Sequence, residues 1–314
     1  MSDSKANYPT PLELVYKCVN GIAIPMDVYV PERSTRENPA PVLLWWHGGG
    51  LLQGTRKALS PHMLTAPAVH GLCVVSVDYR LAPQTRFPGI LADCKDAMDF
   101  IRSETFAKAT GNRVNSSKLV LSGSSAGGWL SLLCGTGIGY EECGLERPAP
   151  VTGIAAFYPI TDLLDSFWTT KQSPVSYVGR KIEHSEIAPF IDPSGPKTTA
   201  SPLDGKRSMF YPYMLQEAIL SSLLLDGTSI PPISFSVAQS LKSGRFTPPP
   251  TYIVHGTKDD KVPHKQATDV VAALKEINAH IIYEELEGLD HNFDKDASYG
   301  MDIMYDFILK VVKK

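Results

Sequence analysis

The chain has 314 residues, of which 43% are hydrophobic and 20% are charged, and its formal net charge is −3. This composition is typical of a soluble globular enzyme, and the length fits one large α/β domain with an insertion. No lysine- or arginine-rich run would follow the phosphates of a nucleic acid, and no apolar stretch is long enough to span a bilayer, so neither nucleic-acid binding nor stable membrane insertion is expected.

The N-terminus and the cysteines indicate a cytoplasmic protein. The first residues lack the apolar core of a signal peptide. The five cysteines cannot all pair within one chain, and none belongs to a Cys-x-x-Cys motif, so a reduced, intracellular protein is expected. No set of histidines, cysteines and carboxylates has the spacing of metal ligands, and we expect neither a metal nor a cofactor.

The first predicted elements are two strands at 12–19 and 22–30, and the turn Asn20-Gly21 between them predicts an antiparallel hairpin. From residue 42 onward, strand-like and helix-like segments alternate. The predicted strands lie at 42–46, 73–78, 118–122, 153–158, 251–255 and 280–285, and the predicted helices at 90–103, 266–277 and 301–312. This alternation predicts an α/β fold with a mostly parallel central sheet flanked by helices.

A glycine-rich run directly follows the predicted strand at 42–46. It reads His47-Gly48-Gly49-Gly50. Glycines at a strand end let backbone N–H groups turn toward a substrate oxygen without a side-chain clash. His47 belongs to this loop, and we expect it to organise the loop by hydrogen bonding rather than to act as a base.

A serine stands at the turn between the predicted strand at 118–122 and a helix-like segment. In Gly123-Ser124-Ser125-Ala126-Gly127, glycines occupy both positions two residues from Ser125. A sharp strand-to-helix turn needs small residues there, because it crowds the backbone of a nucleophile that must stand clear of the sheet. The pattern predicts Ser125 as the nucleophile, whereas Ser124 is one position early.

The chain order locates a candidate acid and a candidate histidine. In this architecture the acid follows the nucleophile and the histidine comes last. The predicted strand ending at His255 leads into a polar loop with Asp259 and Asp260, and the predicted strand at 280–285 leads to His291. Asp259 is favoured as the acid because of its place in the loop, four residues after His255, and Asp260 remains the alternative.

Together these motifs resemble the hormone-sensitive-lipase-like carboxylesterases of the α/β-hydrolase fold. The segments that carry the resemblance extend over nearly the whole chain and lie at 47–50, 78–83, 87–88, 123–128, 256–263 and 290–293. The resemblance implies that Ser125 is the nucleophile, Asp259 the acid and His291 the base.

The resemblance also implies an oxyanion hole, and this sequence departs from the family pattern at two side chains near it. The oxyanion hole would consist of the backbone N–H groups of Gly48, Gly49 and Ala126. Many relatives carry Asp where this chain has Ser124, and Glu where it has Gln84. Both positions lie near the expected site, and neither is a member of the triad.

A long segment rich in proline interrupts the alternation of strands and helices. Loops of such length without structure are uncommon in compact domains and often carry function. Because relatives insert a cap at this point, residues 163–245 are predicted as a cap, and 1–162 with 246–314 as the α/β-hydrolase core. Within the cap, two helix-like pieces are expected around 172–180 and 213–225.

The predicted cap is rich in large apolar side chains, most of which are expected to pack onto the core. A minority is expected to line a pocket, and the candidates are Phe167, Trp168, Tyr177, Phe190, Met209, Phe210, Tyr211, Tyr213 and Met214. A mostly apolar pocket favours an apolar acyl or alcohol group over a sugar or a highly charged substrate.

The resemblance predicts a serine hydrolase that cleaves carboxylic esters of small to medium, largely apolar substrates through an acyl-enzyme. A lactonase, an acyltransferase or a peptidase would use the same triad, and a peptidase would also need carboxylates to hold an amine, for which the candidates are Glu183, Glu186 and Asp192. A non-catalytic receptor is disfavoured because the histidine is present. The expected partner is a small-molecule ester, and a homodimer is left open.

Overall fold

The computed structural model describes residues 8–313. Its central element is an eight-stranded sheet with the order β1-β2-β4-β3-β5-β6-β7-β8. The strands are β1 (Leu12–Val19), β2 (Ile22–Tyr29), β3 (Ala40–Trp46), β4 (Cys73–Val77), β5 (Val114–Ser124), β6 (Gly153–Phe157), β7 (Thr251–Gly256) and β8 (Ile281–Leu286). All neighbours from β4 to β8 pair in parallel, so the predicted α/β class with a mostly parallel sheet is confirmed.

The predicted hairpin forms one edge of the sheet. β1 and β2 pair antiparallel up to Val19 opposite Ile22. Asn20 and Gly21 in the turn have φ values of 51° and 78°, which is the backbone that a type I′ turn requires. β2 also pairs antiparallel with β4 and thereby joins the hairpin to the parallel part of the sheet.

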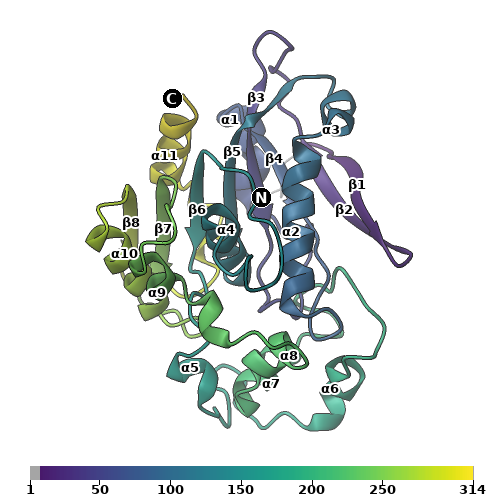
Figure 1. The fold of residues 1–314 in the computed structure, drawn as a ribbon, viewed down its shortest axis with the longest axis vertical. Coiled ribbons are helices and arrows are strands. Elements are labelled where there is room, and N and C mark those ends of the chain that lie inside the picture. The colour runs from purple at the N-terminus through teal and green to yellow at the C-terminus, as the bar shows by residue number, and fades with distance from the viewer. Residues whose placement is uncertain (1–7, 314) are drawn as a thin grey trace, which may run out of the picture.

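Helices cover both faces of the sheet (Figure 1). The helices outside residues 163–245 are α1 (Pro61–Val69), α2 (Phe87–Ile101), α3 (Glu104–Ala109), α4 (Ala126–Thr136), α10 (Lys265–Glu276), the 3-10 helix η2 (Phe293–Lys295) and α11 (Asp302–Lys313). Along β3, Leu44 and Trp46 pack in one core with α2 and α4, whereas Leu43 and Trp45 pack in another with α1 and α11. This two-residue alternation is that of a strand buried on both faces.

The predicted helices at 90–103, 266–277 and 301–312 correspond to α2, α10 and α11 with shifted ends. The sequence did not predict α1 and α3. α1 contains Pro67, whose missing N–H disfavours a helix interior, and α3 has only 6 residues. Neither helix therefore displays an extended 3.6-residue pattern.

Residues 163–245 contain short helices joined by turns and loops, and we call them the inserted segment. Its elements are α5 (Ser166–Thr169), α6 (His184–Ile191), α7 (Phe210–Glu217), α8 (Leu220–Leu225), the 3-10 helix η1 (Pro232–Phe235) and α9 (Val237–Lys242). In Figure 1, α5 to α8 lie together at one end of the sheet. Its side chains can therefore reach the loops that follow the strands.

The helices predicted within the inserted segment need correction. The helix expected at 172–180 is wrong, because this stretch forms turns; Pro174 lacks an N–H, and Gly179 has a φ of 70°, which ends a helical backbone. The helix expected at 213–225 is divided into α7 and α8 at Ala218, whose φ is 57°. The short helices α6 and α9 were not predicted.

A buried arginine joins the inserted segment to the rest of the fold. The Arg207 guanidinium donates to the backbone oxygens of Leu52 and Ala82, at 3.1 and 3.2 Å, and to Gln84 Oε1, at 2.8 Å. The Gln84 amide in turn donates to the Phe190 carbonyl at 2.7 Å. Arg207 is 5% exposed, so this network is shielded from water.

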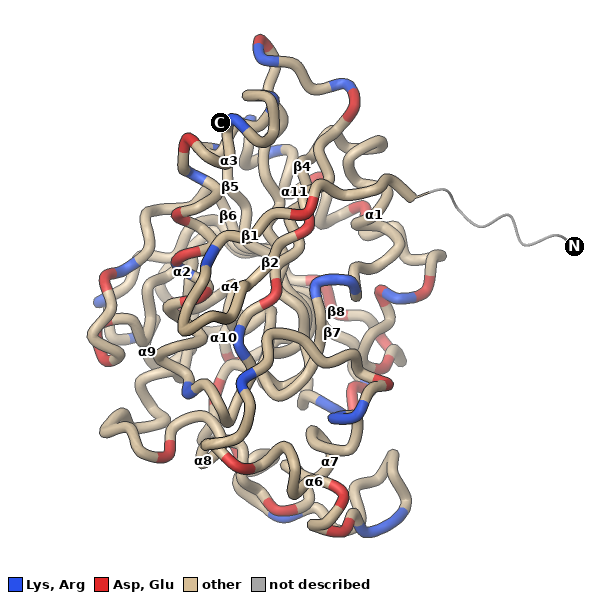
Figure 2. The backbone as a smooth tube through the Cα atoms, turned by 90° about the vertical axis from the view of Figure 1, so that its right-hand side faces the viewer, with Lys and Arg blue, Asp and Glu red and all other residues tan. Residues whose placement is uncertain are grey.

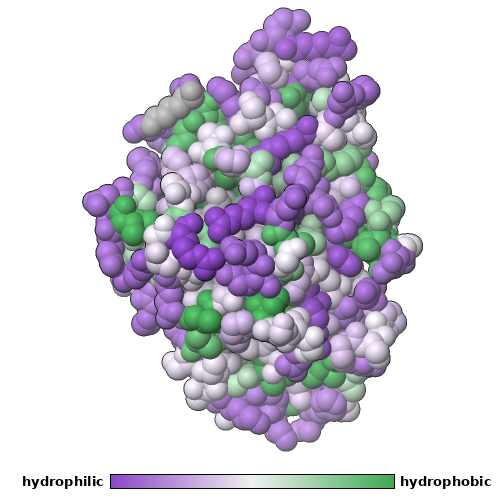
Figure 3. Space-filling model, viewed as in Figure 1, coloured by the Kyte–Doolittle hydropathy of each residue, from purple (hydrophilic) through white to green (hydrophobic). Residues whose placement is uncertain are grey.

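The surface is mixed in character. Lys and Arg alternate with Asp and Glu along the backbone in Figure 2, and the face in Figure 3 is mostly polar with separate apolar groups. Neither view displays one large region of a single kind. Among residues 8–313, no helix combines the length and apolar character needed to cross a membrane.

Candidate active site

Ser125 occupies a strained turn between β5 and α4. Its φ is 57° and its ψ is −120°, which is uncommon for a residue with a Cβ atom. A Cβ atom on Gly123 would lie 2.2 Å from the Gly127 carbonyl oxygen, and one on Gly127 would lie 2.0 Å from the Trp46 carbonyl oxygen. Close packing therefore requires both glycines of the motif, as the sequence pattern predicted.

The glycine loop after β3 approaches this turn closely. A Cβ atom on Gly48 would lie 2.9 Å from the Ser124 carbonyl oxygen and 3.0 Å from Ser125 Cβ. Gly49 has a φ of 101°, a conformation that side chains disfavour. Of the three expected oxyanion donors, Gly48 and Gly49 line the same cavity as Ser125, and Ala126 is buried at the first position of α4.

His47 holds the glycine loop in place through its contacts with Gly48 and Tyr79. Its Nδ1 lies 2.8 Å from the Gly48 carbonyl oxygen, and its ring stacks on Tyr79 with 4.3 Å between the ring centroids. The Tyr79 hydroxyl donates to the His47 carbonyl at 2.9 Å. Burial lowers the pKa of His47, which favours the neutral imidazole.

Asp259 and His291 meet beyond the ends of β7 and β8. His291 Nδ1 lies 2.6 Å from Asp259 Oδ2, while the N–H groups of Lys261 and Val262 each donate to Asp259 Oδ1 at 2.9 Å. Asp260, the alternative acid, pairs with Lys261 instead. The structure thus brings Asp259, not Asp260, to the imidazole.

A second imidazole contacts the same carboxylate oxygen. His255 Nε2 lies 3.1 Å from Asp259 Oδ2, and His255 is fully buried at the end of β7. Burial raises the pKa of Asp259, but hydrogen bonds with His255 and His291 outweigh it and hold the pKa well below its usual range. From the sequence, His255 is only a strand residue, and its four-residue spacing from Asp259 was the available signal.

The far side of His291 rests on an aromatic ring. The Tyr158 and His291 ring centroids are 4.2 Å apart, and the Tyr158 hydroxyl donates to Asp294 Oδ1 at 2.5 Å. With Nδ1 engaged by the carboxylate, Nε2 is the nitrogen that can accept a proton. His291 and Ser125 line one cavity without a hydrogen bond between their side chains in the described residues, and such contacts often tighten only with substrate bound.

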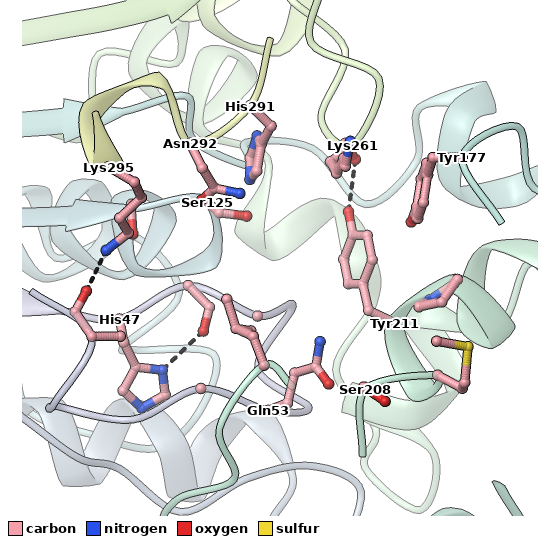
Figure 4. Close-up of a pocket in the computed structure, with 18 of the residues that line it drawn as sticks. His47, Gln53, Ser125, Tyr177, Ser208, Tyr211, Lys261, His291, Asn292 and Lys295 are labelled. Carbon is pink, nitrogen blue, oxygen red and sulfur yellow. Dashed lines mark hydrogen bonds between the residues drawn. The ribbon is translucent and has the colours of Figure 1, made fainter. Parts of the chain in front are cut away.

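A cavity of about 210 Å³ lies in front of Ser125 and His291 (Figure 4). Its walls come from both parts of the chain. The core supplies Trp45, Gln53, Lys261 and Lys295, and the inserted segment supplies Tyr177, Leu203, Met209 and Tyr211. The Tyr211 hydroxyl donates to the Lys261 carbonyl at 2.7 Å and thus fixes this ring across the cavity.

The structure shows which of the large apolar side chains of the predicted cap line the cavity. Three of the nine large apolar side chains, Tyr177, Met209 and Tyr211, line the cavity. The others pack in or against the core, namely Phe167, Trp168, Phe190, Phe210, Tyr213 and Met214. The carboxylates of Glu183, Glu186 and Asp192 are not among the groups that line the cavity. The sequence analysis did not predict Gln53, Lys261 or Lys295 at the site, because no local pattern places them there.

One acidic cluster borders the site. Single oxygens of Asp259, Asp260 and Asp290 lie within 4.8 Å of one another. The Asp259 oxygens already accept from imidazole and amide groups, and the other two carboxylates face Lys261. The negative charge of these three carboxylates is therefore balanced by groups of the protein itself.

The strand order, the strained turn and the order of the site residues along the chain define an α/β hydrolase. The chain belongs to the BD-FAE family, whose model matches residues 26–196, more than half of its length. This match agrees with the resemblance to α/β-hydrolase carboxylesterases that the motifs indicated.

Solved structures have the same fold. An α/β hydrolase superfamily protein from Enterococcus faecalis is 20% identical with a TM-score of 0.70, and the alignment covers 97% of this chain and 99% of the other. The thermophilic esterase Est2 from Thermogutta terrifontis is 20% identical with a TM-score of 0.64, covering 96% and 93%. The same esterase phosphoramylated by tabun has a TM-score of 0.65 at 18% identity, covering 97% and 96%.

The curated relatives are much longer proteins. The non-reducing polyketide synthase ascC of Acremonium egyptiacum is 28% identical over 94% of this chain, which spans 15% of that synthase. The similarity therefore concerns one part of the synthase.

Proposed function

We propose that this protein is a serine hydrolase that cleaves carboxylic esters of small to medium, largely apolar substrates through an acyl-enzyme. The observation that carries the proposal is the hydrogen bond of 2.6 Å between His291 and Asp259 at the cavity that the strained Ser125 lines. The family match, and structural neighbours that include an esterase, support the same reaction class.

In the proposed reaction, His291 Nε2 takes the proton of the Ser125 hydroxyl as its oxygen attacks the ester carbonyl. Asp259 orients the imidazole and stabilises its charged form. The N–H groups of Gly48, Gly49 and Ala126 hold the developing oxyanion, and the loss of one such donor costs about 3–4 kcal/mol of transition-state stabilisation. The alcohol leaves with the proton from His291, and water then cleaves the acyl-enzyme by the same route.

The substitution of Ser125 by alanine tests this assignment. Ser125→Ala is expected to keep the fold and to lower kcat for 4-nitrophenyl butyrate by at least about 10⁴-fold, because the nucleophile is lost. Ser124→Ala is the matched control, and it is expected to retain covalent labelling by a fluorophosphonate probe, whereas Ser125→Ala is not. Unchanged turnover in Ser125→Ala would refute the proposal, and an unlabelled wild-type protein would favour a receptor.

We also propose that the inserted segment acts as a cap over the site. Tyr177, Met209 and Tyr211 supply one wall of the cavity, so their size limits the acyl or alcohol group that fits. Hydrolysis of 4-nitrophenyl esters of increasing acyl length is expected to fall once the chain exceeds the cavity. Met209→Ala is expected to extend the accepted length, and an unaltered length profile in that variant would contradict this role.

The polyketide synthase relatives favour a second candidate, which is hydrolysis or transfer of a polyketide acyl group. The same nucleophile would attack such a group on a thioester carrier. A comparison of butyryl-N-acetylcysteamine with 4-nitrophenyl butyrate, with and without an acceptor alcohol, distinguishes the candidates. A higher kcat/KM for the thioester, or formation of a new ester, would favour the second candidate over simple ester hydrolysis.

A further inference from the structure

The side-chain charges on the cavity wall have one sign. Two lysines, Lys261 and Lys295, line the cavity, and no Asp or Glu is among its lining residues in the described chain. The walls are otherwise largely apolar, with the rings of Trp45, Tyr177 and Tyr211. A ligand in this space therefore meets a positive charge within an aromatic environment.

The first lysine is already neutralised by the protein. Lys261 Nζ pairs with Asp260 and lies 3.6 Å from Asp290 Oδ2. It also lies 4.5 Å from the ring centroid of Tyr177. Lys261 consequently contributes little net charge to a bound ligand.

The second lysine lacks such partners. Lys295 Nζ donates to the Ala58 carbonyl and lies 5.7 Å from the Trp45 ring centroid, while no carboxylate of residues 8–313 lies within 4.0 Å of it. The adjacent Asp294 accepts from Ser60 and Tyr158 instead. Since an ammonium has three donors, two remain for a ligand.

A second polar group in the cavity also lacks a partner. Gln53 is 6% exposed and lines the cavity, and its Oε1 is buried without a hydrogen-bond partner among the described residues. A buried polar atom left unpaired is costly. In Figure 4 the Gln53 side chain lies at the cavity that Lys295 also lines, which makes its amide a candidate second contact for a ligand.

We propose that Lys295 recognises an anionic substituent, a carboxylate, on an otherwise apolar or aromatic ester substrate. This inference rests on the proposed esterase function and specifies its substrate class. The carboxylate accepts hydrogen bonds from the two free donors of Lys295, the aromatic walls enclose the apolar part, and Gln53 accepts a hydrogen bond from a hydroxyl or amide of the substrate. The reacting ester carbonyl remains at Ser125.

Two matched pairs of esters test this proposal, one for each side of the ester bond. On the alcohol side, 4-acetoxybenzoate is compared with methyl 4-acetoxybenzoate. On the acyl side, mono-4-nitrophenyl adipate is compared with its methyl ester. In at least one pair, the anionic member is expected to have a kcat/KM about tenfold higher, which corresponds to about 1.4 kcal/mol and is the order of one hydrogen bond to a charged group.

The ratio of kcat/KM within a pair is the decisive readout, since a general loss of activity cancels from it. Lys295→Met is expected to bring the ratio to about one, and Lys295→Arg to keep it above one. The control Lys258→Met, at an exposed lysine outside the cavity lining, is expected to keep the wild-type value. Raising the salt concentration to 0.5 M is expected to lower the ratio in the wild type, which gives a readout even if Lys295→Met does not fold.

Three outcomes are informative. Neutral esters hydrolysed with no anionic preference in either pair would overturn this inference and leave the esterase function standing. A preference that persists in Lys295→Met would likewise overturn it. If none of the four esters were cleaved in a Ser125-dependent way, the proposed function itself would fail.

Discussion

The core and the inserted segment hold the two sides of the cavity by different means. On the core side, Asp259 accepts hydrogen bonds from amide and imidazole groups, and the glycine loop packs directly against the serine turn. On the other side, Met209 and Tyr177 are placed by apolar packing, and Tyr211 adds one hydrogen bond. The core therefore fixes the geometry of the proposed reacting groups, while the inserted segment fixes the shape of the cavity in front of them.

The largest expected effect lies on the core side. Asp259→Asn removes the charge that orients His291 and is expected to lower kcat for 4-nitrophenyl butyrate by about 10³–10⁴-fold. Tyr177→Ala, on the opposite wall, serves as the comparison and is expected to change KM more than kcat. Similar losses of kcat in both variants would break the distinction between the two sides.

Acid sensitivity of folding is expected to come from the core. Burial lowers the pKa of His62 in α1 from its ordinary value to about 4, so the unfolded chain takes up a proton below about pH 6.5 that the folded chain refuses. Stability is therefore present above pH 6.5 and falls as the pH drops to 4, by about 3 kcal/mol at about 1.4 kcal/mol per unit of pKa.

Urea unfolding at pH 7, 5 and 4 measures this dependence. His62→Gln, which can keep a hydrogen bond to Tyr305 and does not titrate, is expected to lose less stability over the same range. An identical slope in the wild type and the variant would contradict the role of His62.

A smaller effect is expected at His255, which acts through Asp259. His255→Leu removes one of the two imidazole contacts of the carboxylate and is expected to lower kcat by about 10-fold, the equivalent of one charged hydrogen bond. The carboxylate then becomes more basic and stabilises protonated His291, so the acid limb of the kcat/KM profile is expected to move to higher pH. A loss of kcat with an unmoved acid limb would indicate only a packing defect.

The smallest effect is expected at Tyr211 on the side of the inserted segment. Tyr211→Phe removes the hydrogen bond to the Lys261 carbonyl and keeps the ring, with an expected rise in KM of about twofold to fivefold for a bond worth about 1 kcal/mol. Steady-state kinetics with 4-nitrophenyl butyrate measures it. A drop in kcat comparable to that of His255→Leu would show that the inserted segment also positions the reacting groups.

The sequence allowed the core to be predicted because its determinants are local. Buried strands appear as apolar runs, and Ser125, Asp259 and His291 each follow such a run in a fixed order. Lys295 and Gln53 could not be predicted, because their place in the cavity depends on contacts between segments far apart in the chain. The helices of the inserted segment were the hardest elements to predict, because the turn at Gly179 and the break at Ala218 leave helices too short for a periodic pattern.

The hydrogen bonds of Arg207 between the inserted segment and the core have a consequence for how substrates reach the site. Its guanidinium holds three oxygens that lie on the core side, at Leu52, Ala82 and Gln84. A movement of the inserted segment away from the core would break all three hydrogen bonds of the buried Arg207 guanidinium at the same time. We therefore expect ligands to enter through a permanent opening between the two walls of the cavity. Rotation of side chains, rather than a hinge motion of the inserted segment, would then control access.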